Sequence, residues 1–162
     1  MKKILYILVL TILLAGCNLG NTPTAKTEDL LTKYQSLDKS IKISSNDLIK
    51  ENNLPEKYIQ EYERLIKKQY ENLSYEVKEE VIDGDSATVT TEIEVLDYKD
   101  ILTKYNIDIN TDEYHDKLIK ELKKTNKKIT YTIDFTLTKN DKDKWELDEL
   151  TIEQKDKLLG IF

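Results

Sequence analysis

The fold is decided by residues 129–138, which read Ile129-Thr-Tyr-Thr-Ile-Asp-Phe-Thr-Leu-Thr138. Apolar or aromatic residues alternate strictly with threonine or aspartate along this stretch. Successive side chains of a β-strand point to opposite faces, so the alternation predicts a strand with one buried face and one face in water. Asp134 belongs to the polar face, and we expect its carboxylate to lie toward solvent or a partner.

The same two-residue period occurs in other parts of the chain. Tyr75–Val81 and Ala87–Val95 alternate on either side of Asp83-Gly84, a dipeptide typical of a hairpin turn. Residues 145–150 follow the polar turn 140–144 and predict a strand that pairs back on the first one. The sequence therefore predicts an antiparallel sheet of about four strands.

Helical periodicity fills the remaining segments. Thr22-Pro23 has the order of a helix start, in which a capping residue precedes proline. Further helices are predicted from Ser44 to about Glu51, from Pro55 onward, over 97–105 and over 112–124, with a short helix or irregular tail ending at Phe162. The predicted class is α+β, with N-terminal helices packed on a curved antiparallel sheet.

The N-terminus has the pattern of a lipoprotein signal. Lys2-Lys3 precede an apolar run and the box Leu14-Ala-Gly-Cys17. We expect residues 1–16 to be a signal peptide cut between Gly16 and Cys17, and the thiol of Cys17 to carry a diacylglyceryl group with palmitate-type acyl chains. Two acyl chains give stable membrane attachment. The alternatives are an ordinary secretory signal and an uncleaved helix, although Ile4–Ala15 supplies twelve residues where a span needs about 20.

Removal of the signal would leave 146 residues, enough for one domain with a sizeable core. We expect residues 17–21 to form a short tether and residues 22–162 to form a single α+β domain. Cys17 is the one cysteine of the sequence, so the domain is expected to fold without a disulfide.

Charge and composition restrict the partners. The formal net charge of −6 becomes −8 once Lys2 and Lys3 are removed, and lysines alternate with acids, which disfavours nucleic acid as a partner. Among 25 basic residues only Arg64 is not lysine, a bias typical of AT-rich genomes. Together with the cysteine box, it indicates a lipid-anchored protein on the extracytoplasmic face of a Gram-positive cell membrane.

The order of predicted elements resembles a known fold. Helices, a hairpin, an inserted helical stretch and a second hairpin ending in Lys144-Trp-x-Leu-Asp-x-Leu150 are similar to the nuclear transport factor 2-like, cone-shaped α+β fold. Four motifs also resemble a group of Gram-positive lipoproteins with no established activity: Thr22-Pro-Thr, Leu31-x-x-Tyr-Gln-x-Leu-Asp, Val81-Ile-Asp-Gly-Asp-x-Ala-Thr-Val and Tyr131-Thr-Ile-Asp-Phe-Thr-Leu-Thr-Lys. The resemblance implies the fold, but this fold serves many functions and implies no catalytic residue.

Tyrosines are the strongest candidates for a binding site. A cone of this fold would take an apolar lining with tyrosine hydroxyls and a carboxylate. The candidate lining residues are Tyr58, Tyr62, Tyr70, Tyr75 and Tyr131. They form either ordinary core rings or a pocket for a small amphipathic or aromatic ligand.

Other chemistries lack their motifs. His115 is the one histidine, and we expect it to be solvated or half-packed. Calcium-like spacing from Asp108 fails at Glu113 and Ile119, where glycine and glutamate are required, and residues 140–144 are better explained as a polar turn. We therefore predict no catalytic residue, no metal site and no cofactor.

Three functions remain open. The first is a non-catalytic domain that binds a protein, peptide or small ligand, with a possible homodimer through the polar face of residues 130–138. The second is a small-substrate isomerase or hydrolase with a tyrosine-lined cone. The third is an immunity or exclusion lipoprotein that sequesters a membrane-active peptide.

Overall fold

The computed structural model describes residues 20–41, 55–104 and 111–162. Its elements follow one another as α2 (Pro23–Ser36), the 3-10 turn η2 (Glu56–Tyr58), α4 (Ile59–Glu71), β1 (Ser74–Asp83), β2 (Ser86–Leu96), α5 (Lys99–Leu102), α6 (Asp112–Lys124), β3 (Lys128–Lys139), β4 (Trp145–Leu147) and α7 (Ile152–Leu159). The predicted α+β class is confirmed. The helix predicted over 44–51 and the calcium-like run from 106 to 110 lie outside the described residues.

The four strands form one open antiparallel sheet in the order β1-β2-β3-β4. Asp83 pairs with Ser86, so Gly84 and the residue after it make the first turn, and Gly84 has the positive φ of 60° that such a turn requires. In the second turn, Asn140 Oδ1 accepts hydrogen bonds from the backbone N–H groups of Lys142 and Lys144. Both predicted hairpins are confirmed.

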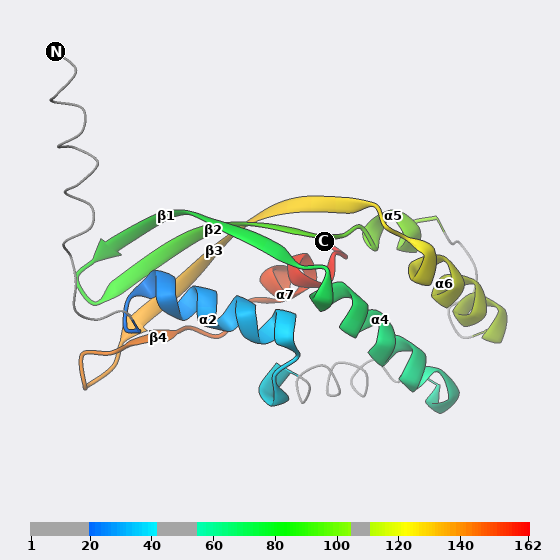
Figure 1. Ribbon diagram of the computed structural model, residues 1–162, viewed down its shortest axis with the longest axis horizontal. Helices are drawn as coiled ribbons and strands as arrows, with labels where there is room; N and C mark the ends of the chain where they lie inside the picture. Colours follow the sequence, from blue (N-terminus) through cyan, green and yellow to red (C-terminus); the bar gives the residue numbers. More distant parts are fainter. Residues whose placement is uncertain (1–19, 42–54, 105–110) are drawn as a thin grey trace, which may run out of the picture.

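One face of the sheet is covered by α2 and α7, which lie beneath it in Figure 1. Thr22 caps α2 by accepting a hydrogen bond from Ala25 N–H, as the Thr-Pro order predicts. The fully buried residues between sheet and helices form the sheet cluster, which includes Leu31, Val89, Ile93, Ile133, Phe135, Leu137 and Leu158. The interior of the sheet is thus filled by side chains.

The opposite face of the sheet is polar and exposed. Thr130, Thr132, Asp134, Thr136 and Thr138 all point to this outer face. The carboxylate of Asp134 accepts a hydrogen bond of 2.6 Å from the hydroxyl of Thr90 on the neighbouring strand. The expected orientation of Asp134, away from the core, is confirmed.

A second group of buried side chains lies beyond one end of the sheet, where α4, α5 and α6 meet (Figure 1). This helical cluster comprises Tyr58, Leu65, Leu96, Tyr98, Ile101, Leu118, Ile119 and Leu122. Gln69 joins it to the sheet, because its side-chain amide accepts from Leu96 N–H and donates to Leu96 C=O. The domain is therefore elongated, with a sheet part and a helical part (Figure 1).

Two elements are shorter than predicted. β4 ends at Leu147 rather than continuing to residue 150, because the chain must turn away from the sheet to enter α7, which begins with a Thr151–Gln154 capping box. Of the helix predicted over 97–105, residues 97–104 are described, and within them the α-helix is α5. Its start is fixed by a hydrogen bond from Asp100 N–H to the buried carboxylate of Asp97.

Candidate functional site

Two of the candidate tyrosines meet the one histidine in the helical part. Tyr62 of α4 places its hydroxyl 2.8 Å from Nδ1 of His115 on α6. The ring of Tyr58 lies against the same imidazole, with centroids 4.8 Å apart, and Tyr114 meets it edge-on at 5.4 Å. Three aromatic rings thus surround His115.

The hydroxyl of Tyr58 is fixed by α6. It donates to the backbone C=O of Asp112 at 3.2 Å and to Oδ1 of Asp116 at 3.1 Å. Burial, together with the hydrogen bond to Asp116, raises the pKa of Tyr58 further above neutrality. Burial also raises the pKa of Tyr62.

His115 is buried, with 4% of its surface exposed. Burial lowers its pKa, the nearby carboxylates of Asp112 and Asp116 oppose that shift, and the ammonium of Lys57 adds to it. The expectation of a solvated or half-packed histidine was therefore wrong. The signal was present in the sequence, because His115, Leu118, Ile119 and Leu122 are spaced as one face of a helix.

A surface pocket lies directly beside this cluster, between α4 and α6. We call it the helix pocket. Its volume is about 470 Å³, and its lining residues are Tyr58, Glu61, Asp116, Ile119, Lys120, Lys123 and Lys124. Tyr58 and Ile119 are the uncharged lining residues, and the aliphatic stems of the lysines add further apolar surface. The pocket is absent from the sequence prediction because the two helices lie about fifty residues apart in the chain.

Ion pairs occupy most of the charged groups at the helix pocket. Glu61 is paired with Lys123 at 2.5 Å and with Arg64 at 2.8 Å, and the bond to Lys123 lowers the pKa of the Glu61 carboxyl. Lys124 is paired with Glu121 at 3.2 Å. Within the part of the chain that the structure describes, Lys120 has no ion-pair partner, so its ammonium is available to a ligand.

The other three candidate tyrosines lie elsewhere. Tyr70 packs edge-on against Tyr34 in the sheet cluster, with centroids 4.8 Å apart. Tyr131 donates its hydroxyl to the backbone C=O of Phe162 at 2.9 Å. Tyr75 reaches toward α2. The five tyrosines therefore do not line one cone. Tyr58 and Tyr62 lie in the helical part, whereas Tyr70 belongs to the sheet cluster and Tyr75 and Tyr131 pack against it.

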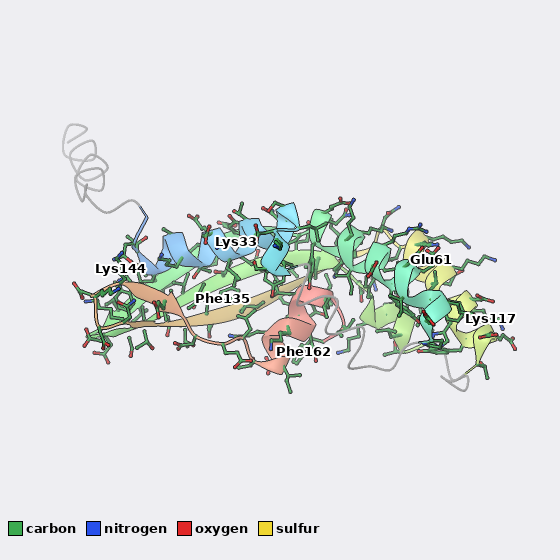
Figure 2. All side chains as sticks on the ribbon, turned by 90° about the horizontal axis from the view of Figure 1, so that it is seen from below. Lys33, Glu61, Lys117, Phe135, Lys144 and Phe162 are labelled. Carbon is green, nitrogen blue, oxygen red and sulfur yellow. The ribbon has the colours of Figure 1, made fainter. Side chains whose placement is uncertain are left out.

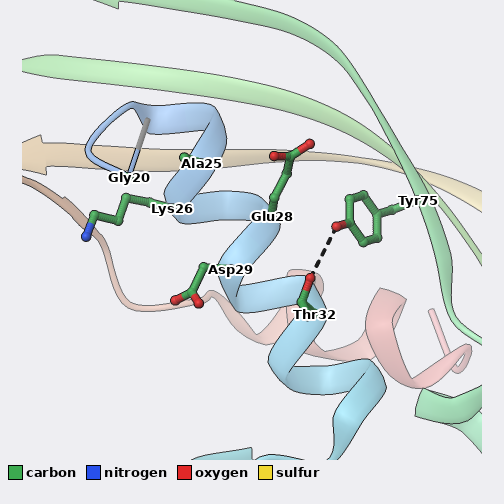
Figure 3. Close-up of a pocket in the computed structure, with 7 residues that line it drawn as sticks. All are labelled: Gly20, Ala25, Lys26, Glu28, Asp29, Thr32 and Tyr75. Atoms are coloured by element: carbon green, nitrogen blue, oxygen red, sulfur yellow. Dashed lines mark hydrogen bonds between the residues drawn. The ribbon is translucent and has the colours of Figure 1, made fainter. Parts of the chain in front are cut away.

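Tyr75 borders an open groove along α2, shown in Figure 3. Its hydroxyl lies 3.4 Å from Oγ1 of Thr32. The groove has a volume of about 560 Å³ and is lined by Gly20, Ala25, Lys26, Glu28, Asp29, Thr32 and Tyr75. Its lining is mostly polar and offers one aromatic ring, and Asp29 is already paired with Lys33 at 2.6 Å. It is the weaker candidate for binding an apolar group.

Metal ligands do not gather at either site. No cluster of three or more His, Cys, Asp or Glu side chains suited to a metal ion occurs among residues 20–41, 55–104 and 111–162. The helix pocket can contribute apolar contact, a fixed tyrosine hydroxyl, a carboxylate and lysine ammonium groups.

Comparisons with known proteins bear on the N-terminus. Residues 1–18 match the family described as the prokaryotic membrane lipoprotein lipid attachment site. The N-terminus of the chain therefore carries a lipoprotein lipid attachment site. The match supports membrane anchoring through a lipid on cysteine, and Cys17 is the one cysteine of the sequence. Among the helices of the described residues, none combines the length and the apolar character needed to cross a membrane.

A solved structure is similar to this chain. It is the crystal structure of YcdA, a candidate lipoprotein of Bacillus subtilis, at 19% sequence identity and a TM-score of 0.44. The match covers 98% of this chain and 54% of YcdA, so the chain spans about half the length of that protein. A comparison with the curated proteins finds no match.

Proposed function

We propose that this lipoprotein is a non-catalytic binding domain held at the extracytoplasmic face of a Gram-positive cell membrane by a diacylglyceryl group on Cys17. In this proposal residues 1–16 are removed as a signal peptide, with cleavage after Gly16. The lipid attachment match at residues 1–18 and the lysine-rich composition support the anchoring and the host.

The order of elements supports a likeness to the nuclear transport factor 2-like fold, but in the described part of the chain the inner face of the sheet is filled by side chains and leaves no open cone. Ile93, Ile133 and Phe135 on the inner face are 1% exposed or less. A ligand therefore binds on the outside of the domain. A tyrosine-lined cone enzyme would need an interior cavity in place of these side chains.

The helix pocket is the observation that carries the binding proposal. The ring of Tyr58 and the side chain of Ile119 supply an apolar floor, and Lys120 supplies an ammonium group without an ion-pair partner among the described residues. Sites for small molecules combine apolar lining with a few placed polar groups. The pocket suits a ligand or protein segment that carries an anionic group on an apolar body.

The arrangement around Tyr58 favours binding over catalysis. Its hydroxyl and the Asp116 carboxylate satisfy each other through a hydrogen bond, and the pKa of the hydroxyl is raised rather than lowered. A general base or nucleophile would need a free, activated group at that position. The pair instead holds the aromatic floor of the pocket in place.

Binding can be tested with 4-fluorobenzoate, which is an anionic group on an apolar ring. The lipidated chain in neutral phosphatidylcholine nanodiscs should broaden the ¹⁹F signal of this probe saturably. A surface charge contact contributes up to about 1 kcal/mol, or about fivefold in affinity. We therefore expect Lys120→Glu to weaken binding by about fivefold or more.

The control is Lys142→Glu, the same charge change at an exposed lysine of the β3–β4 turn. This variant should bind the probe like the unmodified chain. Equal weakening in both variants would mean that net charge, not the helix pocket, attracts the probe, and absence of saturable binding to any variant would refute the proposed ligand class.

A further inference from the structure

Hydrogen bonds join the first described residues of the chain to the second hairpin. Asn21 accepts a hydrogen bond from Trp145 N–H at 3.1 Å and donates through its side-chain amide to Asp143 C=O at 3.4 Å. Thr22 then caps α2, and α2 packs against β4. The position of Asn21 relative to the β3–β4 turn is therefore set by the fold.

Four peptide links separate Asn21 from Cys17. A fully extended chain spans at most about 3.6 Å per residue, so these links reach about 14 Å. The polar layer of one leaflet is itself roughly 5–8 Å thick. A lipid on Cys17 would therefore hold the β3–β4 turn close to the headgroups.

The β1–β2 turn lies at the same end of the domain. The N–H of Lys139 donates to Asp85 C=O at 2.9 Å, and Ser86 pairs with Thr138. We call residues 83–86 and 140–144 together the turn end. Figures 1 and 2 place α6 at the opposite end, with Lys144 and Lys117 labelled at the two extremes in Figure 2.

We propose that the turn end faces the lipid surface and that the helix pocket faces away from the membrane. This inference rests on the proposed lipidation of Cys17. Val81 and Ile82, each 52% exposed and next to the first turn, are the apolar side chains that this orientation brings to the membrane interface.

Charge at the turn end does not by itself select a lipid. Acidic and basic residues are mixed there: Asp83, Asp85, Asp141 and Asp143 occur with Lys142 and Lys144, and Lys139 adjoins them at the end of β3. Lys139 is paired with Asp143 at 3.0 Å and lies 3.7 Å from Asp85. The short tether, rather than attraction to anionic headgroups, therefore sets the orientation, and it should be the same on neutral phosphatidylcholine.

The orientation can be measured with one labelled thiol in the full chain. The lipid consumes the thiol of Cys17, so a cysteine introduced elsewhere is the only free one. Lys144→Cys and Lys117→Cys are matched exposed lysine positions at the two ends. Each is labelled with an environment-sensitive fluorophore and reconstituted into phosphatidylcholine vesicles that carry a nitroxide on the headgroup. We expect severalfold stronger quenching at position 144 than at 117.

Two further measurements separate this inference from the anchoring itself. Flotation with vesicles reports attachment: a chain that fails to float overturns the lipidation, and the orientation with it. A chain that floats but shows equal quenching at both positions, or stronger quenching at 117, overturns the orientation alone.

Insertion of roughly 20 Gly/Ser residues between Leu19 and Gly20 lengthens the tether and should reduce quenching at position 144 to the level at 117. Undiminished quenching would show that the tether does not set the orientation.

Discussion

The hydroxyl of Tyr62 and Nδ1 of His115 lie 2.8 Å apart, and this hydrogen bond joins α4 to α6 within a set of buried and partly buried aromatic rings. A histidine so placed is held uncharged by its surroundings, since burial lowers its pKa. Protonation would put a charge on a side chain that is almost fully buried. The contact therefore makes the stability of the helical part depend on pH.

We expect stability to fall as the pH drops below about 6.5, where histidine in the unfolded chain begins to bind a proton. The folded state resists that proton, so the unfolded state binds more protons and stability rises with pH up to this value. One such group contributes a slope of at most about 1.4 kcal/mol per pH unit. Urea unfolding between pH 5 and 7.5 should show a smaller slope for His115→Gln than for the unmodified chain. Equal slopes would show that His115 titrates alike in both states.

Gly160 should be far less tolerant of substitution than Gly84. Both have positive φ, 69° and 60°. A Cβ on Gly160 would overlap the carbonyl oxygen of Leu96 and the amide nitrogen of Gln69, whereas a Cβ on Gly84 meets open space. We expect Gly84→Ala to cost about 1 kcal/mol from its backbone alone, and Gly160→Ala to cost about 1–3 kcal/mol more from the overlap. Unfolding followed by Trp145 fluorescence would measure both, and equal costs would contradict the prediction.

Thr91 lies on the inner face of β2 and is fully buried. Its hydroxyl has no hydrogen-bond partner among the described residues. A buried unpaired polar group costs about 1–3 kcal/mol, so Thr91→Val, which keeps the shape, should stabilise the domain by about 1 kcal/mol. Thr88→Val, on the outer face of the same strand, should leave the melting temperature nearly unchanged. A lower melting temperature for Thr91→Val would show that the hydroxyl has a partner.

The outer face of β3 is the surface expected to join two copies of the domain. Thr132 and Thr136 are exposed at its centre, and lysines there would set like charges against each other across a two-fold interface. Light scattering of the double variant Thr132→Lys/Thr136→Lys should give the mass of a monomer where the unmodified chain gives that of a dimer. The control is Gln60→Lys/Thr103→Lys at exposed positions on other elements. A dimer mass retained by the outer-face variant would rule out this interface.

Local patterns explain why the sheet could be predicted. The period of residues 129–138 sets which side chains are buried, and Gly84 and Asn140 mark turns by their own backbone chemistry. Thr22 likewise caps its helix through a contact three residues away. Each of these features depends on near neighbours in the chain, which a sequence displays directly.

The site depends on contacts that no local pattern displays. Tyr62 and His115 are 53 residues apart, and the bond that joins them follows from how α4 packs on α6. The five candidate tyrosines share only their residue type, and the structure divides them between the helical part and the sheet part. The helical spacing of His115 with Leu118 and Leu122 predicts that His115 is buried. The helix pocket could not be predicted in this way, because its lining comes from two distant segments of the chain.

The division of the apolar side chains into a sheet cluster and a helical cluster gives the domain two units of local stability. Regions with their own buried contacts open with their own free energies. Backbone amide protons of α6 should then exchange with deuterium through partial openings in which β2 and β3 stay protected. The helical part, which carries the helix pocket, can then open locally while the sheet stays folded.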